Sequence, residues 1–143
     1  MLRIRREQFE AFQPVAEVEF ALRLVEHLRE RHPKAIVRTP GRWTLVNRLS
    51  DAALLELVKS AIERARSYEF KFASSISAFV MLMFKAAPNF DQHPVISKTL
   101  RDPKVPLEIR MQSVAKTTSA ETWAQVKDSY DAGAWNKKSE VTR

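Results

Sequence analysis

The chain has 143 residues, 45% hydrophobic and 29% charged, which is ordinary for one folded domain with a proper hydrophobic core. The absence of cysteine excludes disulfides, thiolate metal sites and cysteine nucleophiles, and two glycines are too few for the usual phosphate-binding motifs. Lysine and arginine number 24 against 17 aspartate and glutamate, and this formal charge of +7 favours an acidic partner, anionic lipid or nucleic acid.

The first strong helix is predicted from about Pro14 to Arg31, with Pro14 in the first turn, where proline is tolerated. Four residues at helical spacing define its expected core face: Val18, Leu22, Val25 and Leu28. Phe9 and Phe12, just before it, are expected to pack inward. The first residues lack the apolar stretch and cleavage site of a secretory signal, which predicts a cytoplasmic protein.

Residues 29–48 hold most of the positive charge. Six cations stand there against the single acid Glu30, a net +5 of the +7: Arg29, Arg31, Lys34, Arg38, Arg42 and Arg48. This segment is either a solvated face or a surface for an acidic partner. For the second interpretation, five cations are the expected contact residues: Arg31, Lys34, Arg38, Arg42 and Arg48.

The middle of this segment is its least regular part. Thr39-Pro40-Gly41 is a turn signal, and residues 43–46 (WTLV) are expected to form a loop or one helical turn, because a lone strand would have no partner. Trp43 lies between Arg42 and Arg48. It is either a core anchor or an exposed aromatic among cations, which would suit a protein partner or stacking on nucleic acid bases. No recognisable nucleic-acid-reading motif accompanies it.

Ser50 or Asp51 is expected to cap a second helix that continues to about Tyr68. Its predicted core positions are Leu54, Leu55, Val58, Ile62 and Ala65. A third helix is expected over residues 72–86. The 13 uncharged residues between Lys71 and Lys85 span about 20 Å of helix, whereas a bilayer span needs about 20 residues. No membrane span is therefore predicted.

The 72–86 helix is apolar all round, which is typical of a helix surrounded by other helices. We expect it to be the central core helix, with Phe79, Met83 and Phe84 buried. The alternative is an exposed apolar groove for a partner, lined by adaptable methionines, and the two can coexist.

Prolines organise the residues that follow. Pro88 is expected to close the helix, Asn89 or Asp91 to cap the next turn, and Phe90 to tuck under the helix end. His93-Pro94 opens a short helix to about Leu100, Asp102-Pro103 breaks it, and Pro106 starts another that runs to about Ala115.

The last helix is expected after a capping box, Thr118 to Glu121, and to run to about Ala132. Trp123, Val126 and Tyr130 would share one face. Gly133 suits a helix stop, Trp135 is expected to dock on the core, and residues 136–143 are predicted to be disordered.

Catalytic and metal-binding patterns are scarce. His27 and His32 are five residues apart, which is the wrong spacing for one helix face, and no HExxH set occurs. Asp91 beside His93 has the composition of an acid–base pair, but its place between Phe90 and Pro94 favours a cap. We therefore expect no enzymatic activity, no metal site and no cofactor.

Four fragments together resemble a known pattern: IRREQFEAF, VEHLRERHP, residues 77–110, and WAQVKDSYDAGAW. The most specific residues of the resemblance are Leu82-Met83-Phe84, Pro88, Phe90-Asp91, Pro94, Leu100, Asp102-Pro103, Pro106 and Arg110. The chain resembles a family of small, uncharacterised bacterial helical proteins encoded beside type VI secretion spike, PAAR-type tip and effector genes. It departs from that family at Ala87, where other members tend to have glycine, and at Asn89, where they tend to have aspartate.

The resemblance implies an adaptor, co-adaptor or chaperone for a secretion effector or spike component, or else an immunity protein that binds a toxin. With the residue patterns, it predicts one all-α domain over residues 1–135, a bundle of five or six helices around helix 72–86. The expected function is a non-enzymatic protein-interaction module. A nucleic-acid-binding protein that uses residues 29–48 is the alternative from another class.

Overall fold

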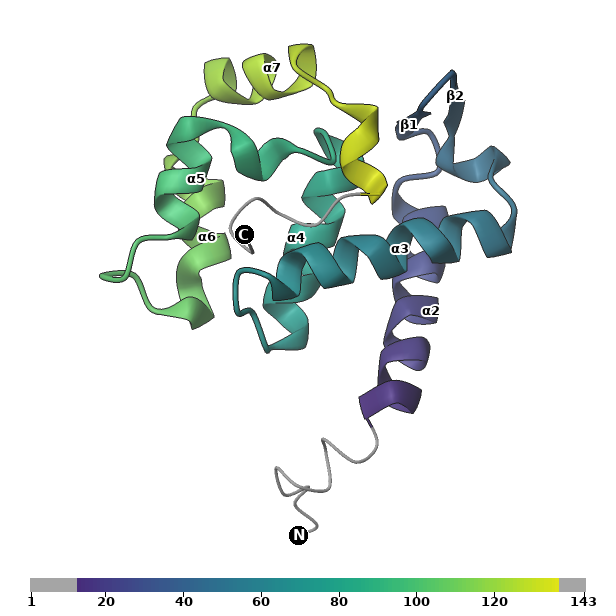
Figure 1. The fold of residues 1–143 in the computed structure, drawn as a ribbon, viewed down its shortest axis with the longest axis horizontal. Helices are drawn as coiled ribbons and strands as arrows, with labels where there is room; N and C mark the ends of the chain where they lie inside the picture. The colour runs from purple at the N-terminus through teal and green to yellow at the C-terminus, as the bar shows by residue number, and fades with distance from the viewer. Residues whose placement is uncertain (1–12, 137–143) are drawn as a thin grey trace, which may run out of the picture.

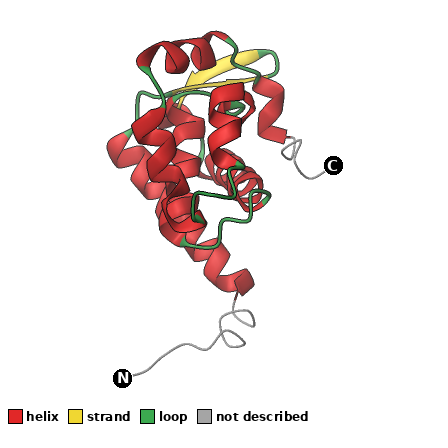
Figure 2. Cartoon of the chain, turned by 90° about the vertical axis from the view of Figure 1, so that its left-hand side faces the viewer, coloured by secondary structure: helices red, strands yellow, loops and turns green. Residues whose placement is uncertain are grey.

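The structure is a computed structural model that describes residues 13–136 (Figures 1 and 2). The predictions for Phe9, Phe12 and the tail after residue 136 lie outside these residues. The described part is mainly helical, as predicted, and it also contains one two-stranded sheet that was not predicted. Its elements are α2 (Gln13–Arg31), β1 (Ile36–Thr39), β2 (Arg42–Leu45), η1 (Val46–Arg48), α3 (Asp51–Arg66), α4 (Ala73–Lys85), η2 (Phe90–Gln92), α5 (Pro94–Leu100), α6 (Leu107–Thr117), α7 (Ala120–Asp128) and η3 (Ala132–Asn136).

The helices are arranged around the pair α3 and α4, which pack against each other. Helix α2 packs on α3, and α6 packs on α4 and also against α5. Figure 1 shows α5, α6 and α7 together on one side, and α2 with the β1–β2 hairpin on the other. The hairpin therefore stands at the edge of the helical body.

Helix α4 is the central core helix that the sequence predicts. Phe79, Met83 and Phe84 are buried, and the Phe79 ring contacts the Phe90 ring with a centroid distance of 4.8 Å. The remaining apolar side chains, Met81 and Leu82, are partly buried against the same core. The helix is thus covered on both sides, which is the first of the two predicted alternatives.

The predicted core face of α2 is partly wrong. Val18 and Leu22 are exposed, and the buried residues of this helix are Ala21, Leu24, Val25 and Leu28. In Figure 1 the first turns of α2 extend past the other described helices, and Arg66 at the end of α3 forms an ion pair there with Glu17. Phe72, the first residue of the predicted 72–86 helix, is likewise exposed and precedes the first turn of α4 as its N-cap.

Helix caps agree with the sequence at α3 and differ at α7. Ser50 caps α3, since its Oγ accepts a hydrogen bond from the Ala53 N–H at 3.1 Å. At α7 the cap is Ser119, not Thr118, because α6 extends to Thr117 and uses Thr118 as its own C-terminal cap. Helix α7 ends at Asp128 instead of Ala132, and Gly133 lies inside η3 instead of stopping a helix.

Residues 42–45 form a strand, which corrects the expectation of a loop or one helical turn over residues 43–46; Val46 alone of these lies in the helical turn η1. Strand β2 pairs antiparallel with β1, from Thr39 opposite Arg42 to Ile36 opposite Leu45. Pro40 and Gly41 make the two-residue connection, and Gly41 adopts a φ of +87°, which glycine reaches without the strain of a Cβ. The sequence pattern indicated no partner for a strand here, but β1, which directly precedes the turn, is that partner.

Candidate interaction surface

The hairpin has one buried and one exposed face. Side chains alternate between the faces of a strand, so Ile36 and Arg38 share a face with their cross-strand partners Leu45 and Trp43. On the other face Val37 is fully buried and anchors the hairpin to the core. Ile36 is 47% exposed and Trp43 67% exposed. Trp43 is therefore an exposed aromatic among cations, and its interpretation as a core anchor is wrong.

Two shallow hollows adjoin along the hairpin, because Ile36 and Arg38 line both. Arg42 pairs with Thr39 and so belongs to the face of Val37, but it also lines the first hollow next to the turn. The first hollow also includes the turn, Arg42, Trp43 and Ala132. The second is lined by Lys34, Lys85, Lys127 and Tyr130, among others. Among the described residues, no aspartate or glutamate lines either hollow. We call this region the hairpin surface, made of Lys34, Ile36, Arg38, Arg42, Trp43, Lys85, Lys127 and Tyr130.

Tyr130 fixes the position of Arg38. The guanidinium carbon of Arg38 lies 5.4 Å from the centre of the Tyr130 ring. The Tyr130 hydroxyl oxygen accepts hydrogen bonds from the Arg38 N–H at 3.0 Å and from the Trp135 Nε1–H at 3.1 Å. Burial raises the pKa of Tyr130, so the phenol stays neutral at physiological pH. Strand β1 and the C-terminal segment are thus joined at the hairpin surface.

The structure brings together four of the six predicted contact residues: Lys34, Arg38, Arg42 and Trp43. Arg31 and Arg48 are exposed but line neither hollow. The sequence reasoning missed Lys85, Lys127 and Tyr130. Lys85 could have been recognised as a candidate from the sequence, because it is the first charged residue after the apolar run of α4. Lys127 and Tyr130 carried none, because only the tertiary fold brings α7 and the turn after it to the hairpin.

Positive charge continues from the hairpin surface toward the end of α2. The pKa of His32 is lowered, first by burial and then by the charges of Lys85, His27 and Arg31. His32 is accordingly neutral at pH 7. Arg31 and Lys85 therefore act on the same region, although only Lys85 lines a hollow.

Arg29, the first cation of the basic segment, has a different place. Its Nη2 donates to the Leu49 carbonyl at 2.7 Å and to the Asp51 carboxylate at 2.8 Å. These bonds attach the end of α2 to the start of α3, just beyond the hairpin. Arg29 therefore holds the hairpin's base and is not available as a free surface charge.

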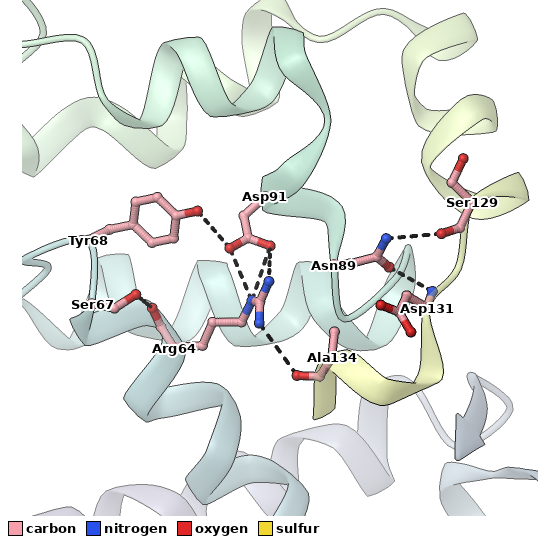
Figure 3. A network of polar contacts seen from close by, with 8 residues as sticks. All are labelled: Arg64, Ser67, Tyr68, Asn89, Asp91, Ser129, Asp131 and Ala134. Atoms are coloured by element: carbon pink, nitrogen blue, oxygen red, sulfur yellow. Dashed lines mark hydrogen bonds and ion pairs between the residues drawn. The ribbon is translucent and has the colours of Figure 1, made fainter. Parts of the chain in front are cut away.

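The turn after α4 contains a buried polar network in place of the predicted cap (Figure 3). Asp91 is fully buried, and its carboxylate accepts from Arg64 Nε at 3.1 and 3.0 Å, from Arg64 Nη2 at 2.9 Å and from the Tyr68 hydroxyl at 2.7 Å. Arg64 Nη1 also donates to the Ala134 carbonyl at 3.5 Å. The Arg64 side chain thus joins α3 to η2 and η3, and Asp91 is its ion-pair partner in the core instead of a cap.

Asn89 also bridges distant segments. Its side-chain amide donates to the Ser129 carbonyl at 2.9 Å and accepts from the Asp131 N–H at 2.9 Å (Figure 3). The expectation that Asn89 organises its own turn is therefore wrong.

His93 points away from Asp91's partners. Its Nδ1 accepts from the Val95 N–H at 3.2 Å and so caps α5, and its Nε2 lies 2.8 Å from the Gln125 side-chain oxygen. The carboxylate of Asp91 is occupied by Arg64 and Tyr68. The two residues consequently do not form the acid–base pair that their closeness in sequence suggested.

Within residues 13–136, no group of three or more His, Asp or Glu side chains is placed to hold a metal ion. None of the described helices is both long and apolar enough to cross a membrane.

Comparison with protein-family models found no match, and comparisons with curated proteins and with solved structures found no significant one.

Proposed function

We propose that this chain is a protein-binding module that holds an acidic partner on the hairpin surface. One observation carries the proposal: five cations line the two hollows together with the exposed apolar side chains of Ile36 and Trp43, and within residues 13–136 no acidic side chain lines them. In protein interfaces, aromatic residues at the centre supply much of the affinity. Surrounding charges speed association and select the partner.

A protein partner fits the apolar component of the surface. Ile36, Pro40 and Ala132 line the hollow with Trp43, and such side chains gain from contact with other apolar groups. Nucleic acid is the second candidate, because Trp43 between Arg38 and Arg42 has the arrangement of a base-stacking platform. The two candidates differ in their response to salt. Binding to phosphates releases counterions, and this release stabilises the complex less as the salt concentration rises, so the affinity for nucleic acid falls steeply.

The proposed role in the cell is delivery of a type VI secretion effector, as adaptor or chaperone, and it rests on the sequence resemblance. An immunity protein would use the same surface to cover a toxin. Both roles require a protein partner with acidic side chains at the contact.

The test uses the whole chain immobilised as bait in a nuclease-treated extract of the native host, at low and moderate salt. We expect an acidic protein to be retained and to be lost when Arg38 and Arg42 are both replaced by Glu. The matched control replaces Lys98 and Lys104 by Glu, which lowers the net charge equally at exposed sites on the α5 side of the molecule.

With the retained protein purified, calorimetry should show that the Arg38→Glu, Arg42→Glu variant binds at least about 100-fold more weakly, since each reversed charge costs more than about 1.4 kcal/mol. The control should stay within about threefold. Equal affinities of the two variants would contradict the proposal. Retention of nucleic acid alone, lost with nuclease, would replace it with the second candidate.

A further inference from the structure

The hydrogen-bond pattern of the hairpin shows which backbone groups of β2 face outward. In an antiparallel pair, hydrogen-bonded and non-hydrogen-bonded residue pairs alternate. Val46 N–H donates to the Ala35 carbonyl at 2.9 Å, so the alternation makes Thr44–Val37 and Arg42–Thr39 the bonded pairs. Trp43 and Leu45 therefore direct their N–H and C=O groups away from β1.

The two edges of the sheet differ in what covers them. On the outer edge of β1, the Arg38 N–H is bonded to Tyr130, and η3 and α4 pack against the strand. On the outer edge of β2, no described residue outside the hairpin and η1 forms a hydrogen bond with the backbone of Trp43 or with the N–H of Leu45, whereas the Leu45 carbonyl begins η1 as its N-cap. In Figure 1, β1 lies between β2 and η3. One edge is closed and the other is open.

We propose that the partner adds a strand to this open edge: an extended, acidic segment of another protein pairs with β2 through the backbone of Trp43 and Leu45. The proposal rests on the proposed function and specifies how the partner is held. An exposed edge strand is a template for such pairing, in which backbone bonds give affinity and side chains give selectivity.

Charge selects the occupant of the edge. Arg42 begins β2, Arg48 follows it in η1, and the sequence between Glu30 and Asp51 contains five cations and no acid. A second copy of the chain on this edge would bring two sets of these cations together, which is unfavourable. Acidic side chains on an added strand would instead lie beside Arg42 and Arg48. The same cations that oppose self-association thus favour an acidic segment.

The experiment begins with a library of random peptides of about ten residues, long enough for one strand, panned on the whole chain. We expect enrichment of sequences rich in Glu, Asp and β-branched residues and free of proline. The most enriched peptide is then synthesised in two isomeric forms. Each is N-methylated at two alternate positions, one form at odd and the other at even positions.

Only one of the two isomers should lose binding. Residues of a strand point their N–H groups alternately to either side, so one isomer loses the donors that face β2 and the other loses donors that face solvent. By fluorescence anisotropy, we expect the first to bind at least about tenfold more weakly than the unmethylated peptide and the second to bind nearly as well. Amide signals of Trp43 and Leu45 should become protected from hydrogen exchange only with the binding peptides.

The outcomes separate this inference from the proposed function. Acidic peptides that bind with both isomers equivalent would overturn strand addition and leave the protein-binding role in place. Enrichment of no peptide, or of peptides without acidic residues, would overturn strand addition by an acidic segment, and the extract experiment with the Arg38→Glu, Arg42→Glu variant then decides on the proposed function. Peptides whose binding survives the Arg42→Glu substitution would likewise contradict the charge argument.

Discussion

Arg64 and Asp91 place opposite charges in the centre of a helical core, with exposed fractions of 1% and 0%. Removing two charges from water costs several kcal/mol per ion, and their attraction offsets this only when their hydrogen-bonding groups are also satisfied. Here the carboxylate accepts from three donor groups on two residues. The network is therefore highly sensitive to the loss of one member.

Replacing Asp91 with Asn leaves the buried guanidinium without an anion. We expect the free energy of unfolding to fall by about 3–5 kcal/mol in urea denaturation. The control is Asp102→Asn, a partly exposed aspartate whose carboxylate accepts a hydrogen bond from the Lys104 N–H within its own turn, where the loss should stay below about 1 kcal/mol. Similar losses in the two variants would contradict the importance of the buried pair.

His32 gives the molecule a specific response to acid. Its pKa is lowered in the folded state by burial and nearby cations, so between that value and the ordinary 6.5 the unfolded chain binds more protons. The free energy of unfolding should therefore rise as the pH increases through this window. A His32→Gln variant should show a smaller slope of the free energy of unfolding against pH, measured by urea denaturation just below pH 6.5. An unchanged slope would show that His32 does not contribute.

Element boundaries give a second class of test, at the start of α7. Ser119→Ala removes the side chain that accepts the Thr122 N–H, and should lower the free energy of unfolding by about 1 kcal/mol. Thr118→Ala is the matched control, because the Thr118 backbone N–H still donates to the Val114 carbonyl. The sequence pattern of a capping box predicts the reverse order, so thermal denaturation of the two variants decides between them.

Helices were predictable where apolar residues recur at helical spacing over several turns and a serine or proline marks an end, as in α3 and α4, or where prolines mark both ends, as in α5. The hairpin was not, because its two strands of four residues carry cations and an exposed tryptophan instead of a regular alternation. Part of the hairpin surface could be predicted from the density of positive charge in residues 29–48, which includes Lys34, Arg38 and Arg42, and from the place of Trp43 among these cations. Tyr130 and Lys127 could not, since only packing of α7 brings them there.

At the scale of the whole molecule, the described fold is completed by its last segment. Trp135 is 1% exposed, its ring lies 4.7 Å from that of Phe84, and its carbonyl accepts a hydrogen bond from Ser60. Trp135→Ala should cost about 3–5 kcal/mol of unfolding free energy in calorimetry. Trp43→Ala, which removes an exposed tryptophan, should change it by about 0.5 kcal/mol or less. Equal effects would contradict the assignment of Trp135 to the core.

The position of η3 has a consequence for the order of events during translation. A ribosome makes α3 and α4 well before it reaches Trp135, so the nascent chain exposes Phe84 and the Arg64 side chain lacks the Ala134 carbonyl. Domains generally fold as units, and incomplete cores leave apolar surface open to aggregation. Closure of this core therefore has to wait until almost all of the described chain has been synthesised.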